Sequence, residues 1–144
     1  MGSQKKEIYF LLGIGGAIVA TNFILGRIFG PATWTNWWIA NILHFLGGFY
    51  AFFFVRTCFL YTKSRHQISA PQKTEIIIFI VGALVLGVFW EWFELLLDRY
   101  RVFIEAKPSV MTYADNIGDL ITDTLGAAVA GTYLWKRKSK RLLN

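Results

Sequence analysis

Residues 76–97, IIIFIVGALVLGVFWEWFELLL, form an apolar run in which Glu91 and Glu94 are the only charged residues. A helix needs about 20 residues to cross a hydrocarbon core about 30 Å thick, and this run meets that length. Three further apolar stretches lie on either side of it, at residues 8–29, 37–61 and 113–135. Each of the four stretches therefore predicts a membrane-spanning helix.

Composition excludes a soluble domain. Hydrophobic residues make up 55% of the 144 residues and aromatic residues 17%, which is more apolar surface than a soluble chain of this size can bury. We expect one all-α domain over residues 1–144, a polytopic membrane protein whose four transmembrane helices form a compact bundle. The connections at 30–36, 62–75 and 98–112 each contain a proline, as is typical of segments between helices.

Basic residues predict the orientation of the chain. Two Lys precede the first span, three Lys or Arg lie in the second connection and five follow the last span, against three in the third connection. Cytoplasmic segments of membrane proteins are enriched in Lys and Arg, so both termini are expected in the cytoplasm, in a multi-pass protein of the cell membrane. This topology requires residues 113–135 to cross, although that stretch carries three Asp.

Ionisable residues within the spans are the candidate functional residues. A charged side chain at the centre of a membrane helix costs roughly 2.5–3.5 kcal/mol, so such groups are functional candidates by default. Spacings of three or four residues place them on one face of each helix, and the predicted orientation puts all of them in the outer half of the bilayer. They are His44 in the second span, Glu91 and Glu94 in the third, and Asp115, Asp119 and Asp123 in the fourth, and the polar amide of Asn41 lies on the same face as His44.

These polar faces predict one buried site. Glycines lie on or near the same faces and would let the helices approach closely: Gly47, Gly48, Gly87, Gly118 and Gly126. Clustered carboxylates in a low dielectric require a compensating positive charge. A divalent metal, Mg, Ca, Mn or Zn, is one compensation, with ligands His44, Glu91, Glu94, Asp119 and Asp123. Pairing with Arg27, Arg99 or Arg101 is the other, and protonated acids are a third.

Several of these residues also have simpler interpretations. Asp115 follows Thr112 at the spacing of a helix-capping box, and Asn41 is expected to hold two helices together. His44 would equally suit a neutral hydrogen bond between helices. The lone Cys58 excludes a disulfide framework and a zinc–thiolate cluster, and the basic tail is expected to contact anionic lipid. No nucleic-acid partner is expected.

The motifs resemble those of the VanZ-like group of small bacterial membrane proteins and its YjdF-like relatives. The matching pieces are His44-Phe45 with Gly47-Gly48, Trp90-Glu91 with Glu94, and Asp119, Asp123, Gly126 and Gly131, over residues 37–131. Asp123 stands where the VanZ-like pattern often has Asn. The resemblance implies a role in the cell envelope, with a link to glycopeptide-antibiotic resistance in some relatives.

Three functions are consistent with these observations. The first is a membrane-embedded enzyme or binding protein that uses the metal on the head group of a lipid or envelope precursor. The second is a cation or proton transporter or channel subunit, which would require a homo-oligomer because four helices are few for a pathway. The third is a scaffold whose polar site only locks the bundle. The sequence leaves open whether catalysis takes place.

Overall fold

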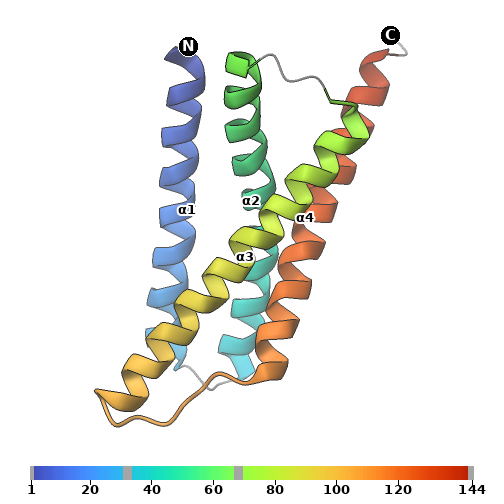
Figure 1. Ribbon diagram of the computed structural model, residues 1–144. Coiled ribbons are helices and arrows are strands. Elements are labelled where there is room, and N and C mark those ends of the chain that lie inside the picture. Colours follow the sequence, from blue (N-terminus) through green and yellow to red (C-terminus); the bar gives the residue numbers. More distant parts are fainter. Residues whose placement is uncertain (1, 31–33, 67–69, 143–144) are drawn as a thin grey trace.

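The computed structural model describes residues 2–30, 34–66 and 70–142, which fold into four long helices. Helix α1 spans Gly2–Phe29, α2 Trp34–His66, α3 Gln72–Phe103 and α4 Tyr113–Leu142. Figure 1 shows that α1 begins, α2 ends, α3 begins and α4 ends at the same end of the bundle. The predicted all-helical architecture is therefore confirmed.

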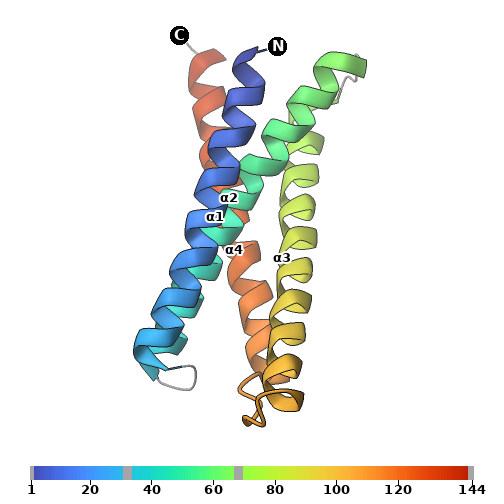
Figure 2. The same cartoon turned by 90° about the vertical axis from the view of Figure 1, so that its left-hand side faces the viewer.

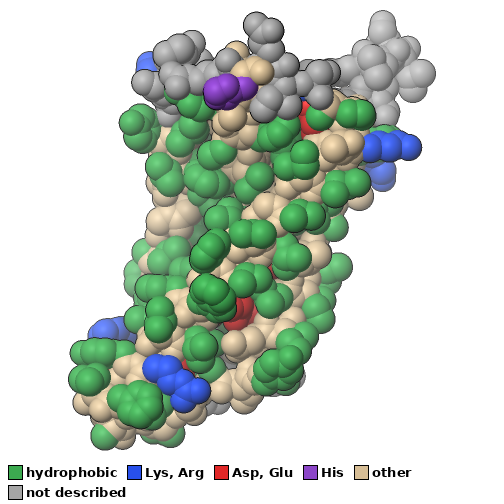
Figure 3. All heavy atoms as spheres, viewed as in Figure 1, with side chains coloured by type: hydrophobic (Ala, Val, Ile, Leu, Met, Phe, Trp, Pro, Cys, Tyr) green, Lys and Arg blue, Asp and Glu red, His purple; other side chains and the backbone are tan. Residues whose placement is uncertain are grey.

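Three of the helices are long and apolar enough to cross a membrane. The candidate spans cover Lys6–Phe29, Trp37–Ser64 and Gln72–Phe103. Figure 3 shows one face of the molecule covered by hydrophobic side chains, with Lys and Arg side chains near its two ends. Helix α4 is as long but does not reach the same apolar character, so its crossing stays a prediction.

The helices extend beyond the predicted spans. Helix α3 continues to Phe103, six residues beyond the end of the predicted span at Leu97. Hydropathy marks where lipid contact ends, and a helix can continue through polar residues beyond that level. The helix ends shortly before two residues that do not continue it: Ala106, whose φ is 52°, and Pro108. Helix α2 likewise continues into the predicted second connection and ends at His66.

Two connections begin or end where the sequence breaks a helix. Gly30 has a φ of 80°, and its N–H donates to the carbonyl of Gly26 at 3.0 Å, which closes α1 in the manner of a C-terminal glycine cap. Pro71 directly precedes α3. Residues 31–33 of the predicted first connection, which include Pro31, lie outside the described residues.

The core lies between α2, α3 and α4, in the half of the bundle where α2 ends and α3 begins. Phe52 and Phe79 are its largest fully buried side chains, and their rings meet edge to face with centroids 5.5 Å apart. Alanines around them allow close packing. The buried hydrophobic residues are Ala51, Phe52, Phe79, Ala83, Ala127, Ala130 and Leu134.

Helix α1 lies at the periphery of the bundle. It packs along α2, and no Cα of α1 lies within 8 Å of a Cα of α3 or α4 in the described ranges. None of its described side chains is buried. Figure 2 shows α1 in front of α2, apart from α3. Most of the packing that fixes the site therefore comes from the other three helices.

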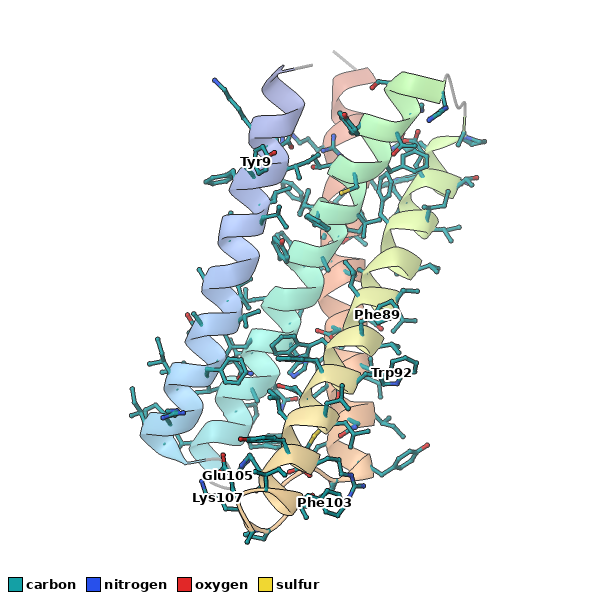
Figure 4. The ribbon with its side chains drawn as sticks, turned by 60° about the vertical axis from the view of Figure 1, so that its left-hand side comes forward. Tyr9, Phe89, Trp92, Phe103, Glu105 and Lys107 are labelled. Carbon is teal, nitrogen blue, oxygen red and sulfur yellow. The ribbon has the colours of Figure 1, made fainter. Side chains whose placement is uncertain are left out.

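Large apolar side chains cover the outer surface of the helices. Tyr9 of α1 is 70% exposed, and Phe89 and Trp92 of α3 are 60% and 62% exposed. In Figure 4 these side chains point away from the bundle. Exposed aromatic surface on several helices is expected of a protein whose surroundings are lipid.

Candidate metal centre

His44 stands at the centre of four carboxyl groups. Its Nδ1 lies 3.5 Å from Oδ2 of Asp123 and 3.8 Å from Oε1 of Glu91. Its Nε2 lies 3.6 Å from Oδ2 of Asp119 and 3.9 Å from Oε2 of Glu94. Each ring nitrogen thus faces one acid from α3 and one from α4. The structure brings together all five residues that the sequence suggested as metal ligands.

Small residues allow the helices to approach at this point. A Cβ built on Gly48 of α2 would overlap the backbone carbonyl of Asp123 in α4. In the opposite direction, a Cβ on Gly126 of α4 would overlap the carbonyl of Phe45 in α2. A Cβ on Gly87 of α3 would lie 2.7 Å from Oδ2 of Asp123. The absence of side chains at these positions therefore places the acids of α3 and α4 around His44.

The other two glycines contribute less. A Cβ on Gly47 would lie at an ordinary contact distance of 3.7 Å from Oδ1 of Asp123, and one on Gly118 would have nothing within 4 Å. Gly118 therefore does not lie where two of the described helices approach each other closely. The expectation that it would bring the polar faces together was wrong, because it lies on a face of α4 that no neighbouring helix covers so closely.

Glu91 has the most unusual environment in the cluster. Only 4% of the residue is exposed, and neither of its carboxyl oxygens has a hydrogen-bond partner among the described residues. Its nearest charged neighbour is the His44 ring, at a distance too long for a hydrogen bond. A buried carboxyl group without a partner loses its hydration and gains nothing in exchange. Such a group in a native structure requires an explanation.

Four of these residues can meet at one metal ion. His44, Glu91, Glu94 and Asp119 each offer one ligand atom, and these atoms all lie within 4.8 Å of one another. One imidazole with several carboxylates suits hard or borderline divalent ions. Asp123 lies on the Nδ1 side of His44, where a carboxylate commonly orients a metal-binding imidazole.

Helix α1 contributes a residue that the sequence analysis did not single out. The amide of Asn22 donates a hydrogen bond to Oε1 of Glu94, with Nδ2 and Oε1 3.2 Å apart. The signal was present, because an amide late in the first span lies at the same predicted level as His44. Asn22 was missed because a single amide in a membrane helix is easily interpreted as a contact between helices.

Two residues of the predicted polar faces have structural partners. Asn41 donates to the carbonyl of Trp37 at 2.9 Å and accepts a hydrogen bond from Thr122 of α4 at 3.4 Å, so it joins two helices. Asp115 caps α4: its N–H donates to Oγ1 of Thr112 at 3.1 Å, and that hydroxyl donates to its carboxylate at 2.6 Å. Both match the simpler interpretations given above.

Arginine does not compensate the acids of the cluster. Across the ranges that the structure describes, Arg27, Arg99 and Arg101 form no ion pair with any carboxylate of the site. Arg27 and Arg99 are exposed instead. The positive charge that the cluster requires is therefore not supplied by these three side chains in this arrangement.

Other buried acids have ordinary partners. Asp98 accepts a hydrogen bond from Oγ of Ser109 at 2.6 Å and another from the N–H of Val110 at 3.0 Å, which fixes the segment between α3 and α4. Glu75 pairs with Lys63 at 2.5 Å, near the end of α2. The contrast with Glu91 shows that burial of an acid in this fold does not by itself leave it without a partner.

A cavity of about 350 Å³ reaches the cluster from the side of α1. His44, Asp123 and Asn22 line its polar end, and most of its remaining wall is apolar. Figure 3 also shows acidic side chains at the surface within the hydrophobic face. The cavity therefore connects His44 and Asp123 of the cluster with the side of the bundle on which α1 lies.

Taken together, three apolar helices and a buried cluster of His, Glu and Asp define a multi-pass membrane protein with a polar centre. Residues 9–140 match a family described as "Predicted membrane protein (DUF2238)", and the chain belongs to that family. No curated protein and no solved structure gives a significant match. The membrane assignment is thus confirmed, while the VanZ-like and YjdF-like resemblance stays a prediction.

Proposed function

We propose that the cluster binds one divalent metal ion and that the protein uses this ion to bind or act on the phosphate-bearing head group of a lipid or envelope precursor. The observation that carries the proposal is Glu91, a buried carboxyl group without a hydrogen-bond partner among the described residues, beside an imidazole that other acids surround. A metal ion would give Glu91 the partner that it lacks.

The ligand set follows from the two sides of the imidazole. We assign Nε2 of His44, with Glu94 and Asp119 beside it, to the metal. Glu91 has one oxygen 3.8 Å from Nδ1, but it completes the set because a ligand atom of each of the four residues lies within 4.8 Å of the others. Asp123 then accepts the hydrogen bond from Nδ1 and fixes the orientation of the ring. Mg, Ca, Mn and Zn all accept carboxylate oxygens, and the imidazole nitrogen favours Zn over Ca.

The scaffold alternative requires every acid to be paired with Arg or His. Glu91, Glu94, Asp119 and Asp123 instead share one imidazole, which can carry a single positive charge at most. Carboxylates held this close repel each other unless a cation lies between them or some of them are protonated. A cluster built only to hold the bundle together would be more stable with hydrophobic side chains in its place.

The transporter alternative requires a polar path beyond the cluster. On the other side of it, the space between α2, α3 and α4 is filled by the fully buried rings of Phe52 and Phe79 and by alanines. A close-packed apolar core of this kind offers no hydrogen-bond partners to a proton or a hydrated ion. We therefore favour head-group chemistry over transport and over the homo-oligomer that transport would require.

A bound metal would supply two kinds of chemistry to a head group. It would neutralise the charge of a phosphate, or it would lower the pKa of a bound water so that the water could act as a nucleophile. The predicted orientation puts the site in the outer half of the cell membrane, where envelope precursors are consumed. The VanZ-like resemblance is in line with a role of this kind.

Elemental analysis of the detergent-purified protein tests the proposal. The wild type is compared with the double variant Glu94→Gln, Asp119→Asn after dialysis without chelator. The control is the double variant Glu105→Gln, Asp115→Asn, which removes the same charge outside the cluster. We expect near-stoichiometric metal in the wild type and the control, and none in the first variant. A folded wild type without metal, even after divalent ions are added back, would contradict the proposal.

A further inference from the structure

The cavity beside the cluster has a polar end and an apolar end. At the polar end, Asn22 of α1 and His44 of α2 line its wall. From there it extends along α1 toward Leu12, a distance of about 15 Å at 1.5 Å per helical residue. Leu12, Ile18, Val19, Phe54, Leu86 and Trp90 form much of the apolar wall. Its volume lies within the range of roughly 300–1,000 Å³ that is typical of small-molecule sites.

The wide separation of α1 and α3 leads us to place the opening of the cavity between them. The backbones of these helices do not approach within 8 Å in the described ranges, so no helix-to-helix packing closes this side. Two side-chain contacts bridge them near the polar end: the hydrogen bond from Asn22 to Glu94, and an edge-to-face contact between Phe23 and Phe93. From this bridge toward Leu12, the opening lies within the two apolar spans. In a membrane, the hydrocarbon chains of the lipids would face this part of the opening.

We infer that this cavity holds one acyl chain of a phospholipid whose phosphate head group lies at the His44 cluster, an inference that rests on the proposed function. The polar and apolar ends of the cavity match the two parts of such a lipid. The phosphate complements the cluster only when a cation is bound, because the carboxylates alone would repel it.

Glycines of α1 and α2 line part of the cavity wall. A Cβ on Gly15 would lie 2.6 Å from the hydroxyl of Tyr50, so α1 and α2 leave little room at this level. Glycines also line the wall on the α2 side, at Gly47 and Gly48. Because glycine has no side chain, these positions take up none of the space that an acyl chain would occupy.

Helix α1 offers a matched pair of substitutions. A Cβ on Gly16 and a Cβ on Gly13 would both have nothing within 4 Å, so a side chain at either position requires no shift of the helices. Only Gly16 lines the cavity. Gly16→Leu should therefore fill the space for the chain, whereas Gly13→Leu changes the same helix by the same residue outside the cavity.

The test uses the full-length protein in vesicles of phosphatidylethanolamine and phosphatidylglycerol that contain a phosphatidylglycerol with a diazirine in one acyl chain. After illumination, mass spectrometry locates the adducts. We expect adducts on cavity residues such as Leu12 and Val19 in excess over the outward-facing Phe89 and Trp92. Gly16→Leu should lower the cavity adducts several-fold, and Gly13→Leu should leave them unchanged. Adducts spread evenly over the surface, or equal in both variants, would overturn the inference.

Metal analysis of the same samples separates this inference from the proposed function. Metal in the wild type and in Gly16→Leu, without enriched cavity adducts, would overturn the acyl-chain site and leave the metal site standing. Enriched adducts in a wild type that holds no metal would overturn the metal site and support a chain-binding cavity alone. Both are supported when metal is retained in Gly16→Leu while the cavity adducts fall.

Discussion

Gly48 of α2 lies so close to Asp123 of α4 that even a Cβ at this position would overlap the Asp123 carbonyl group. Gly126 of α4 has the same relationship to Phe45 of α2. Two such contacts, one in each direction, fix how α2 and α4 pack. They also fix the distance between His44 and Asp123, because each lies within four residues of one of these glycines.

Gly48→Ala should therefore destabilise the fold. The added methyl group forces the two helices apart, and overpacking of this kind costs about 1–3 kcal/mol. Thermal denaturation in detergent measures the change. Gly13→Ala is the control, because a Cβ there meets nothing within 4 Å. Equal stability of the two variants would show that the close approach of α2 and α4 is not required.

Metal should stabilise the folded protein. A ligand that binds only the folded state at 100 times its dissociation constant contributes about 2.7 kcal/mol. We expect the denaturation midpoint of the wild type to rise on titration with Mn or Zn, and that of Glu94→Gln, Asp119→Asn to stay constant. A rise of the same size in both proteins would point to binding elsewhere on the chain.

Asp123→Asn should weaken metal binding without abolishing it. In the proposed ligand set Asp123 orients the His44 ring and does not contact the metal, and loss of such a partner typically lowers metal affinity by 10- to 100-fold. Competition with a chelating dye measures the dissociation constant. Complete loss of metal in Asp123→Asn would instead make Asp123 a direct ligand, as the sequence analysis suggested.

Periodicity made much of the site predictable. Spacings of three or four residues placed Glu91 with Glu94 and Asp119 with Asp123, and loop charges put these faces at one level without reference to the acids. The structure shows these four acids around His44. The four acids and His44 lie at one depth because of the helical repeat and because successive helices run in opposite directions. Both properties can be inferred from the sequence.

Other features depend on information that the sequence does not contain. The role of Asn22 depends on how α1 is rotated about its axis, which a nearly uniform apolar helix leaves undetermined. The predicted span ends at Leu97 because the residues after it are polar. The helix itself continues to Phe103, since no glycine or proline interrupts the chain before Pro108. The cavity depends on the separation of α1 and α3, a result of packing between helices.

Asp98 should be important for the segment between α3 and α4. It accepts hydrogen bonds from Ser109 and Val110, and Asp98→Ala would leave those donors without their partner. We expect a loss of about 1–3 kcal/mol in the free energy of unfolding, measured by denaturant titration in mixed micelles. Glu105→Ala is the control: Glu105 forms an ion pair with Lys107 at the surface, where Figure 4 labels both residues, and its loss should be small. If the two variants unfold alike, Asp98 does not hold this segment.

The predicted crossing of α4 can be tested by cysteine labelling in a Cys58→Ser background. Single cysteines are introduced at Ser64, Lys107 and Lys136, and intact cells are treated with a maleimide that cannot cross the membrane. If α4 crosses, only Lys107→Cys should be labelled from outside. Labelling of both Lys107→Cys and Lys136→Cys would place the two ends of α4 on the same side of the membrane and contradict four spans.

The peripheral position of α1 has a consequence for the kinetics of lipid exchange. Helix α1 buries none of its described side chains, and its contacts with α3 include a hydrogen bond from Asn22 and a ring contact from Phe23. If α1 gave up these contacts and pivoted on α2, it would move away from α3 while His44 and its four acids stay held by the other helices. A chain could then enter or leave the cavity through a local fluctuation, much faster than the core unfolds.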